Sequence, residues 1–277
     1  MKRFEPLKSL PPEEFLREGG VTLEQFLTLR DLVVADLTTE RLRYPIKNRG
    51  KQVRRLTVED KLLLLLPYVR HYPTFQQVGR QFGISESSAH KRYERSRDRL
   101  IRLLRLPGHT AAWAPGRLAG FLDVTAHPID RPTRHQRADY SGKKKRHTGK
   151  AHLLVGVFRL QILAVVGGLG RTHEFHLFKQ ARLPLAPQVE VYADAGYQGI
   201  HRLHPARDIP ITTSKRHVLT PDERAYHRAL ARLRIAIEPV NRRCKIFRIV
   251  KETDRGKHRH IGLTWHLVAG LVNLRYA

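Results

Sequence analysis

Apolar residues in the first third of the chain recur at the spacing of helices. Between residues 23 and 37 they return every three or four positions, which is typical of a helix with one buried face. A second helix is predicted after Thr57, whose hydroxyl is placed to cap it, and it carries the apolar run of residues 62–66. Residues 1–20 hold three prolines and a glycine pair, so they predict an irregular arm.

Residues 73–104 show a short helix, a glycine turn and a longer capped helix. Thr74 and Gln77 have the spacing of a capping box. Gly83 suits the left-handed turn, and Ser85 is placed to cap the next helix. This order predicts a helix-turn-helix, whose second helix enters the major groove of DNA; a helical hairpin with a charged face is the alternative. The candidate DNA contacts on that helix are Ser87, Ser88, His90, Lys91, Arg92 and Arg95.

Beyond residue 117 the apolar pattern becomes that of strands. A run over residues 118–124 delivers Asp123 as it ends, and the alternation over residues 189–194 ends on Asp194. Three further strands and one helix are expected, the strands over residues 153–160, 162–166 and 209–213 and the helix over residues 174–183. The pattern therefore predicts a mixed α/β layer, with acids at strand tips where a metal ion could be held.

A long basic helix carries a third acid, Glu238. At about 100° per residue, Arg234, Glu238 and Lys245 share one face, and Arg242 lies at its edge. A carboxylate among cations suits a metal ligand with neighbours that position phosphates. A surface stripe of salt bridges explains the helix, taken alone, at least as well. Pro239 predicts that either the helix kinks there or a second helix begins. The shared face of Arg234, Glu238 and Lys245 depends on a continuous helix.

Charge indicates the class of partner. The formal net charge is +27, with 52 Lys and Arg against 25 Asp and Glu, spread along the whole chain. A polyanion, first of all nucleic acid, is the expected partner; a ribosomal-type or merely basic soluble protein is the alternative. The single cysteine, Cys244, excludes a disulfide framework and suits a reducing cytoplasm. No membrane is expected, because the run of residues 62–66 falls far short of the roughly 20 apolar residues of a membrane span.

Four motifs, taken together and in this order, resemble those of bacterial insertion-sequence transposases of the insertion-sequence-five family. They are residues 122–132 (Leu-Asp-Val-Thr-Ala-His-Pro-Ile-Asp-Arg-Pro), 140–148 (Tyr-Ser-Gly-Lys-Lys-Lys-Arg-His-Thr), 193–199 (Ala-Asp-Ala-Gly-Tyr-Gln-Gly), and 234–238 with 245–248. The resemblance covers nearly the whole chain. One departure from the family pattern is Glu174, which follows His173 where an aspartate is usual.

The resemblance implies a ribonuclease H-like catalytic core with a three-acid active site. Carried over by position, the acids are Asp123, Asp194 and Glu238, and carboxylate oxygens suit two Mg²⁺ ions, for which Mn²⁺ may substitute. Outside the helix-turn-helix, the residues expected to contact DNA are Lys143, Lys144, Lys145, Arg146, Arg234, Arg242 and Lys245. The expected organisation is an N-terminal arm and helix (1–56), a helix-turn-helix domain (57–106), a linker (107–116) and the catalytic domain (117–277).

The function that follows is a DNA transposase. It would bind the inverted-repeat ends of its own element in double-stranded DNA, cut there, and join the freed 3′-hydroxyl to target DNA. It is expected to act as a homo-oligomer on DNA, in the bacterial cytoplasm at the nucleoid. Two alternatives stay open: a catalytically inactive DNA-binding repressor or relic, and a metal-dependent nuclease without strand transfer. The three intact acids argue against the inactive relic.

Overall fold

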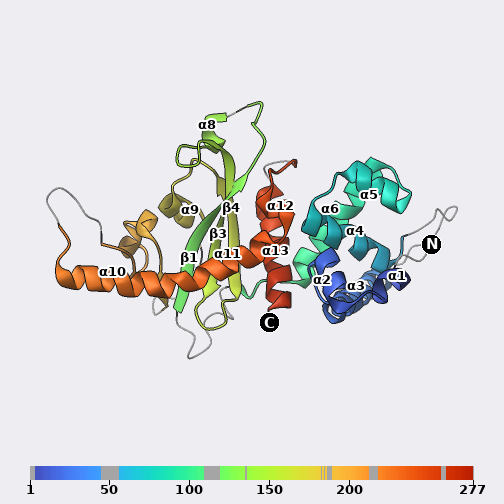
Figure 1. The fold of residues 1–277 in the computed structure, drawn as a ribbon, viewed down its shortest axis with the longest axis horizontal. Coiled ribbons are helices and arrows are strands. Elements are labelled where there is room, and N and C mark those ends of the chain that lie inside the picture. The colour runs from blue at the N-terminus through green and yellow to red at the C-terminus, as the bar shows by residue number, and fades with distance from the viewer. Residues whose placement is uncertain are drawn as a thin grey trace. The chain divides into compact units, whose positions relative to one another are not determined.

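The computed structural model describes residues 4–44, 56–108, 119–134, 136–181, 183, 185, 189–211, 218–256 and 260–276. The chain divides into two compact units, coloured by sequence in Figure 1. One is Met1–Arg105 with Ile246–Ile249, and the other is Leu106–Lys245 with Val250–Ala277. Most of the expected linker, residues 109–116, lies outside the described residues.

The described part of the N-terminal unit is helical. Its helices are α1 (Phe4–Lys8), α2 (Pro12–Gly19), α3 (Leu23–Arg43), α4 (Val58–His71), α5 (Phe75–Phe82) and α6 (Glu86–Leu103). Helix α4 packs against the five others, and its whole run Leu62–Leu66 is buried. A helix that is apolar on all sides belongs at the centre of its domain.

The prediction of an irregular arm over residues 1–20 is wrong. Pro12 stands in the first turn of α2, where a proline costs no hydrogen bond, and Gly20 ends that helix in the left-handed conformation (φ 74°). Phe15 of α2 is buried, and its ring packs edge-on against Phe26 at 5.6 Å between centroids. The arm is therefore part of the core of this unit.

The predicted capping of the helix-turn-helix is confirmed. Thr74 and Gln77 cap α5 reciprocally, with N–H donors 3.2 and 2.8 Å from their acceptors. Gly83 ends α5 at φ 62°, and Ser85 accepts a hydrogen bond from the backbone N–H of Ser88 to cap α6. A Cβ on Gly79 would stand 2.7 Å from the carbonyl oxygen of Ile84, so the turn crosses α5 at a distance that only glycine allows.

A mixed sheet forms the centre of the second unit. Its strands are β1 (Ala119–Pro128), β2 (Tyr140–Ser141), β3 (Arg146–Gly156), β4 (Ile162–Leu169), β5 (Glu190–Tyr192) and β6 (Arg207–Asp208). The order is β4-β3-β1-β5-β6, and β2 pairs with the start of β3. Strand β3 is antiparallel to β1 and β4, whereas β5 is parallel to both β1 and β6. The predicted fold class is thus confirmed: a ribonuclease H-like mixed sheet after a helical N-terminal region.

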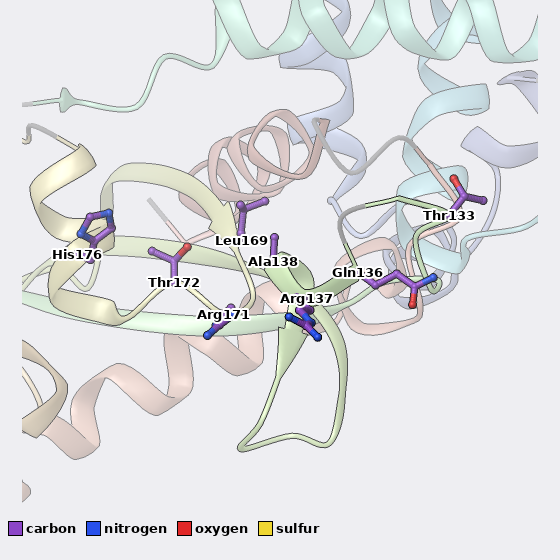
Figure 2. Close-up of a pocket in the computed structure, with 8 residues that line it drawn as sticks. All are labelled: Thr133, Gln136, Arg137, Ala138, Leu169, Arg171, Thr172 and His176. Carbon is purple, nitrogen blue, oxygen red and sulfur yellow. The ribbon is translucent and has the colours of Figure 1, made fainter.

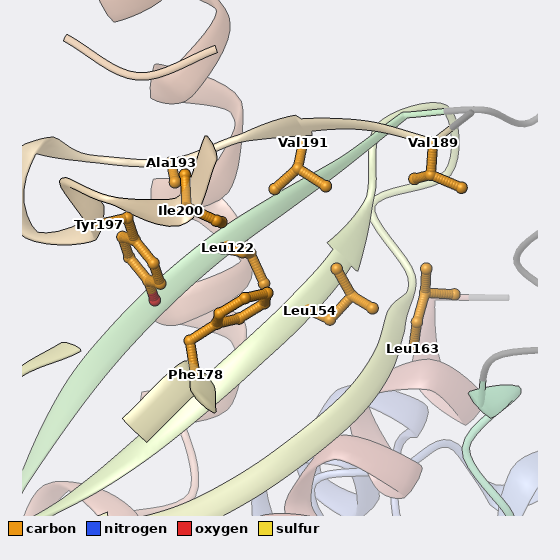
Figure 3. Packing of buried hydrophobic residues seen from close by; sticks show 9 residues of the cluster. All are labelled: Leu122, Leu154, Leu163, Phe178, Val189, Val191, Ala193, Tyr197 and Ile200. Atoms are coloured by element: carbon orange, nitrogen blue, oxygen red, sulfur yellow. The ribbon is translucent and has the colours of Figure 1, made fainter. Parts of the chain in front are cut away.

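Both faces of this sheet are covered by helices. Helix α9 (Glu174–Ala181) contributes Phe178 to a buried apolar cluster with Leu122, Leu154 and Tyr197 (Figure 3). Helix α13 (Ile261–Arg275) packs on β3 and β4. A Cβ on Gly167 of β4 would stand 2.9 Å from the Cα of Gly262, so α13 lies against the sheet with backbone touching backbone.

Strand β1 continues beyond its predicted end at Val124. The polar residues Thr125 and His127 stay buried inside the strand, and the indole N–H of Trp265 in α13 lies 3.3 Å from the His127 ring nitrogen Nδ1. For His127, a partner from α13 makes burial of the polar ring compatible with the strand, which local sequence does not reveal. The expected strand over residues 209–213 is also displaced: the structure has β6 at 207–208, and residues 212–213 lie outside the described residues.

The predicted long basic helix is interrupted. Thr220 caps α10 (Pro221–Arg234) as expected, but a 3₁₀ turn, η3 (Ile235–Ile237), follows, and α11 (Glu238–Lys245) then begins. Pro239 occupies the first turn of α11, where proline is tolerated. Figure 1 shows α10 and α11 running end to end, but the turn between them makes the single-helix arithmetic for Arg234, Glu238 and Lys245 wrong.

Candidate active site

Asp123 lies on β1, and Asp194 follows the neighbouring parallel strand β5 by two residues. Asp123 lies in the middle of β1, opposite Leu153 of β3, and not at a strand tip as predicted. The last pair between β1 and β5 is Phe121 with Tyr192, so the same register carried two residues further places Asp123 beside Asp194. Adjacent strands lie about 4.8 Å apart, and residues at matching positions point to the same face. The register thus directs the first two predicted acids to neighbouring positions, and the charges of both act on the Tyr197 hydroxyl.

One oxygen of Asp123 is held by an amide. The Asn241 side-chain N–H donates to Asp123 Oδ2 at 2.6 Å. Asn241 lies on α11, three residues after Glu238, and its own Oδ1 is buried without a hydrogen-bond partner. An amide oxygen that lacks a hydrogen bond and lies beside a carboxylate is suited to bind a hard cation, or to accept a hydrogen bond from the water bound to that cation. Sequence reasoning missed Asn241, although its spacing of three from Glu238 marks the same side of a helix.

Asp194 sits in a tight turn directly after β5. It caps the 3₁₀ turn η1 (Ala195–Tyr197), and its Oδ1 accepts a hydrogen bond of 2.8 Å from the Gly196 backbone N–H. Arg234, at the end of α10, brings Nη2 to 4.0 Å from Asp194 Oδ2. Both side chains of this ion pair are partly exposed, which leaves the carboxylate accessible.

A fourth acid, Glu174, meets Asp194. The two carboxyl groups are hydrogen-bonded, and a Cβ on Gly196 would stand 2.1 Å from Glu174 Oε2, so this contact requires the glycine. Burial, followed by the charge of Asp194, raises the pKa of Glu174 to about 7. Two carboxyl groups that are hydrogen-bonded to each other share a proton unless a cation takes the place of that proton. The sequence signal for Glu174 was its place after His173, where an aspartate is usual in the resembling family.

Lys150 and Tyr197 complete the surroundings. The Lys150 ammonium donates to the Thr172 carbonyl at 2.6 Å, and burial lowers the pKa of Lys150 while the charge of Glu174 opposes that shift. Burial raises the pKa of Tyr197 well above its usual value, and the charges of Glu174, Asp123 and Asp194 add to the effect. The charges of these three carboxylates therefore all act on one buried hydroxyl.

Carboxylate oxygens are suitable ligands for a hard divalent cation, but the three predicted acids do not lie close enough together to form a metal site. Among the described residues, no group of three or more His, Cys, Asp or Glu side chains is close enough to hold a metal ion. Glu238 is exposed at the start of α11. The unpredicted Glu174 thus contacts Asp194, and the charges of Asp123, Asp194 and Glu174 all act on Tyr197, whereas Glu238 makes no hydrogen bond or ion pair with any of these acids in the described part of the chain.

The predicted DNA-contacting residues of α6 differ in exposure. Lys91 and Arg95 are exposed four residues apart, opposite the buried Ala89 and Tyr93. Arg92 is half-buried, with its Nε buried and unbonded. The remaining residues lie at the start of α6: Ser87 is exposed, Ser88 joins the Ser85 cap, and His90 lies 3.6 Å from Glu94.

Six of the seven predicted basic residues of the second unit are exposed, and the seventh, Arg234, is half-buried. Lys143, Lys144 and Lys145 form the turn between β2 and β3, and Arg146 opens β3. Arg242 and Lys245 are exposed on α11. No helix in the described part of the chain is long and apolar enough to cross a membrane.

Comparison with known proteins gives consistent matches. Residues 122–273 match the family described as DDE superfamily endonuclease, and residues 54–106 match the helix-turn-helix of DDE superfamily endonuclease. The chain is 35% identical, over 279 residues and 99% of both chains, to the "Probable transposase for insertion sequence element IS702" of Microchaete diplosiphon. No solved structure matches the chain detectably.

Proposed function

Because this chain belongs to the DDE superfamily of endonucleases, we propose that it is the transposase of a bacterial insertion sequence. It binds the terminal inverted repeats of its element, cuts the DNA there and joins the freed 3′-hydroxyl to target DNA. The 35% identity to a probable insertion-sequence transposase along the full chain supports this. The helix-turn-helix and endonuclease domains imply DNA binding. Assignment to the insertion-sequence-five family rests on the four motifs of residues 122–248.

Endonucleases of this superfamily generally use divalent metal ions. We infer that Asp123, Asp194 and Glu238 are the ligands of Mg²⁺, with Mn²⁺ as a substitute. Bound there, the ions would activate a hydroxyl and stabilise charge on the phosphate. The observation that supports this inference is that Asp123 of β1 and Asp194, two residues after the neighbouring strand β5, both act by their charge on the Tyr197 hydroxyl. The hydrogen bond of Asn241 to Asp123 supports Glu238 as the third ligand, because helical residues three apart lie on the same side of a helix, with Cβ atoms about 5–6 Å from each other.

Residues around the ligands have positioning roles. Asn241 orients the Asp123 carboxylate, and Glu174 holds Asp194 from the other side. Arg234 is close enough to Asp194 to contact a phosphate bound there. The loop of Lys143–Arg146, with Arg242 and Lys245, is proposed to hold the DNA backbone, and α6 reads the ends through Lys91 and Arg95. Acting on two ends at once requires a homo-oligomer on the DNA.

Replacing Asp123 tests the proposal. Asp123→Asn should abolish Mg²⁺-dependent nicking of end DNA and leave its binding unchanged, while Asp222→Asn, exposed in the first turn of α10, should change neither. Full cleavage by Asp123→Asn would overturn the site. A product joined to target plasmid separates a transposase from a nuclease without strand transfer.

The positioning role of Glu174 has its own measurement. Glu174→Gln should weaken Mn²⁺ binding, followed by electron paramagnetic resonance, by about tenfold, as for other groups that orient a metal ligand. Glu238→Gln should weaken it at least as much if Glu238 is a ligand. Unchanged Mn²⁺ binding in Glu238→Gln would remove that residue from the site.

A further inference from the structure

Two clefts that share lining residues lie beside α8 (Gln136–Asp139). The larger, of about 830 Å³, is lined by Arg137 of α8 and by Leu169, Arg171 and His176 (Figure 2). The smaller, of about 570 Å³, shares both arginines and adds Arg131. Clefts of this size accommodate a nucleotide-sized ligand.

The lining of both clefts is basic. Arg131, Arg137 and Arg171 are exposed, and none of them forms an ion pair with the residues that the structure describes. Neither cleft has an acidic side chain among its described lining residues. The Gln136 amide oxygen accepts from Arg131 Nε at 3.1 Å and Nη2 at 2.9 Å, which orients the guanidinium without neutralising it. Unpaired arginine forks are suited to phosphate oxygens.

The backbone fixes the two shared arginines next to each other. The Arg171 N–H donates to the Ala138 carbonyl at 3.1 Å, which ties the connection after β4 to α8. A Cβ on Gly170 would stand 2.3 Å from the Thr148 carbonyl oxygen and 2.6 Å from that of Asp139, so the chain passes there with no room for a side chain. Figure 2 shows Arg137 and Arg171 side by side, with Ala138 and Leu169 beside them. The two cations are thus presented by a rigid support.

The same connection leads directly to the acids. Thr172 lines the larger cleft and accepts the hydrogen bond of Lys150, and two residues later Glu174 contacts Asp194. An extended chain spans at most about 3.6 Å per residue, so the backbones of Arg171 and Glu174 lie within about 11 Å. One strand of duplex DNA advances about 3.4 Å per nucleotide along the axis. Measured between these backbones, the cleft is therefore at most about three nucleotides from a phosphate held at the acids.

We propose that Arg137 and Arg171 bind a backbone phosphate of the cleaved DNA strand, within about three nucleotides of the scissile bond. Arg131 orients the neighbouring phosphate, and the exposed Leu169 contacts the sugar between them. The contact is independent of base sequence and fixes how far the strand advances past the acids. This inference rests on the proposed function, because it takes the acids as the point of cleavage.

The test uses the full-length protein carrying Asp123→Asn. Its binding is measured to a set of duplexes of the element end, each with a single methylphosphonate at a different position. A methylphosphonate lacks the charge of the phosphate that it replaces. One position within about three nucleotides of the cleavage point should weaken binding by about tenfold. The same substitution should have no further effect on the protein that also carries Arg137→Ala and Arg171→Ala, because the contact is already lost. Arg159→Ala, an exposed arginine in the turn between β3 and β4, is the matched control and should keep full sensitivity.

A second readout is the salt dependence of binding. Each lost phosphate contact reduces the slope of log affinity against log salt by about 0.9, so the double variant should show a smaller slope than Arg159→Ala. Equal slopes, or equal sensitivity to the methylphosphonate at every position, would overturn the proposal. Both readouts measure binding without cleavage, so they succeed or fail separately from the nicking assay on Asp123→Asn alone.

Discussion

A buried histidine that contacts Tyr197 makes the stability of the second unit depend on pH. The His152 side chain is 1% exposed on β3, with Nε2 at 2.8 Å from the Tyr197 hydroxyl and Nδ1 buried without a partner. Burial lowers the pKa of His152 from 6.5 to about 4. The folded protein therefore keeps this ring neutral at a pH where the unfolded chain protonates it.

The sign and the size follow from linkage. Because the unfolded state binds the additional proton, the contribution of His152 to stability is complete above pH 6.5 and is lost as the pH falls towards 4. A shift of about 2.5 pKa units corresponds to about 3 kcal/mol. Since whole domains are stable by about 5–15 kcal/mol, this loss is large.

Urea unfolding followed by circular dichroism between pH 6.5 and pH 4 measures the effect. The comparison is a double variant, His152→Leu with Tyr197→Phe, which removes both partners of the hydrogen bond and so leaves no buried group unpaired. Its free energy of unfolding should fall by about 3 kcal/mol less than that of the parent protein over this range. His173→Gln, at an exposed position, should behave as the parent. An equal fall in the double variant would refute the reasoning.

Three further outcomes are expected. Gly79→Ala should destabilise the N-terminal unit by about 1–3 kcal/mol, because the added Cβ clashes with the carbonyl oxygen of Ile84. Gly83→Ala should destabilise it by about 1 kcal/mol, because the space there is open but the backbone φ is positive. Thermal melts that rank the two variants in the opposite order would contradict this. Charge reversal at Lys91 and Arg95 should weaken binding of end DNA by at least about tenfold in fluorescence anisotropy without changing the circular dichroism spectrum, and unchanged binding would move recognition off α6. Affinity of the parent protein for end DNA should fall steeply with added salt, and a flat titration would argue against broad phosphate contact.

Local signals in the sequence predicted the helix starts well. Thr57, Thr74, Ser85 and Thr220 each cap the helix they were expected to cap. A cap depends on residues within one turn of each other, so its information is contained in a short window. The general fold class followed from the periodicity of the apolar runs in the same way.

Features that depend on distant partners were not predictable. The end of β1 was misplaced because its polar residues are buried against α13, more than a hundred positions away. Glu174 and Asn241 reach the acids from the start of α9 and from α11, and no local pattern records either contact. The shared face of Glu238 failed because η3 interrupts the helix, and only Pro239 gave warning of the break.

The packing of α13 has a consequence for truncated copies of the protein. This helix covers the sheet through the contact of Gly262 with Gly167, yet it is synthesised long after the strands it covers. A frameshift between residues 256 and 260 would leave the N-terminal unit whole, including Ile246–Ile249, and would expose the apolar face of β3 and β4. If the chain is the proposed transposase, decayed copies of this kind would lose cleavage but keep the helix-turn-helix unit that is proposed to bind the element ends. They would thereby compete with intact copies and restrain the spread of the element.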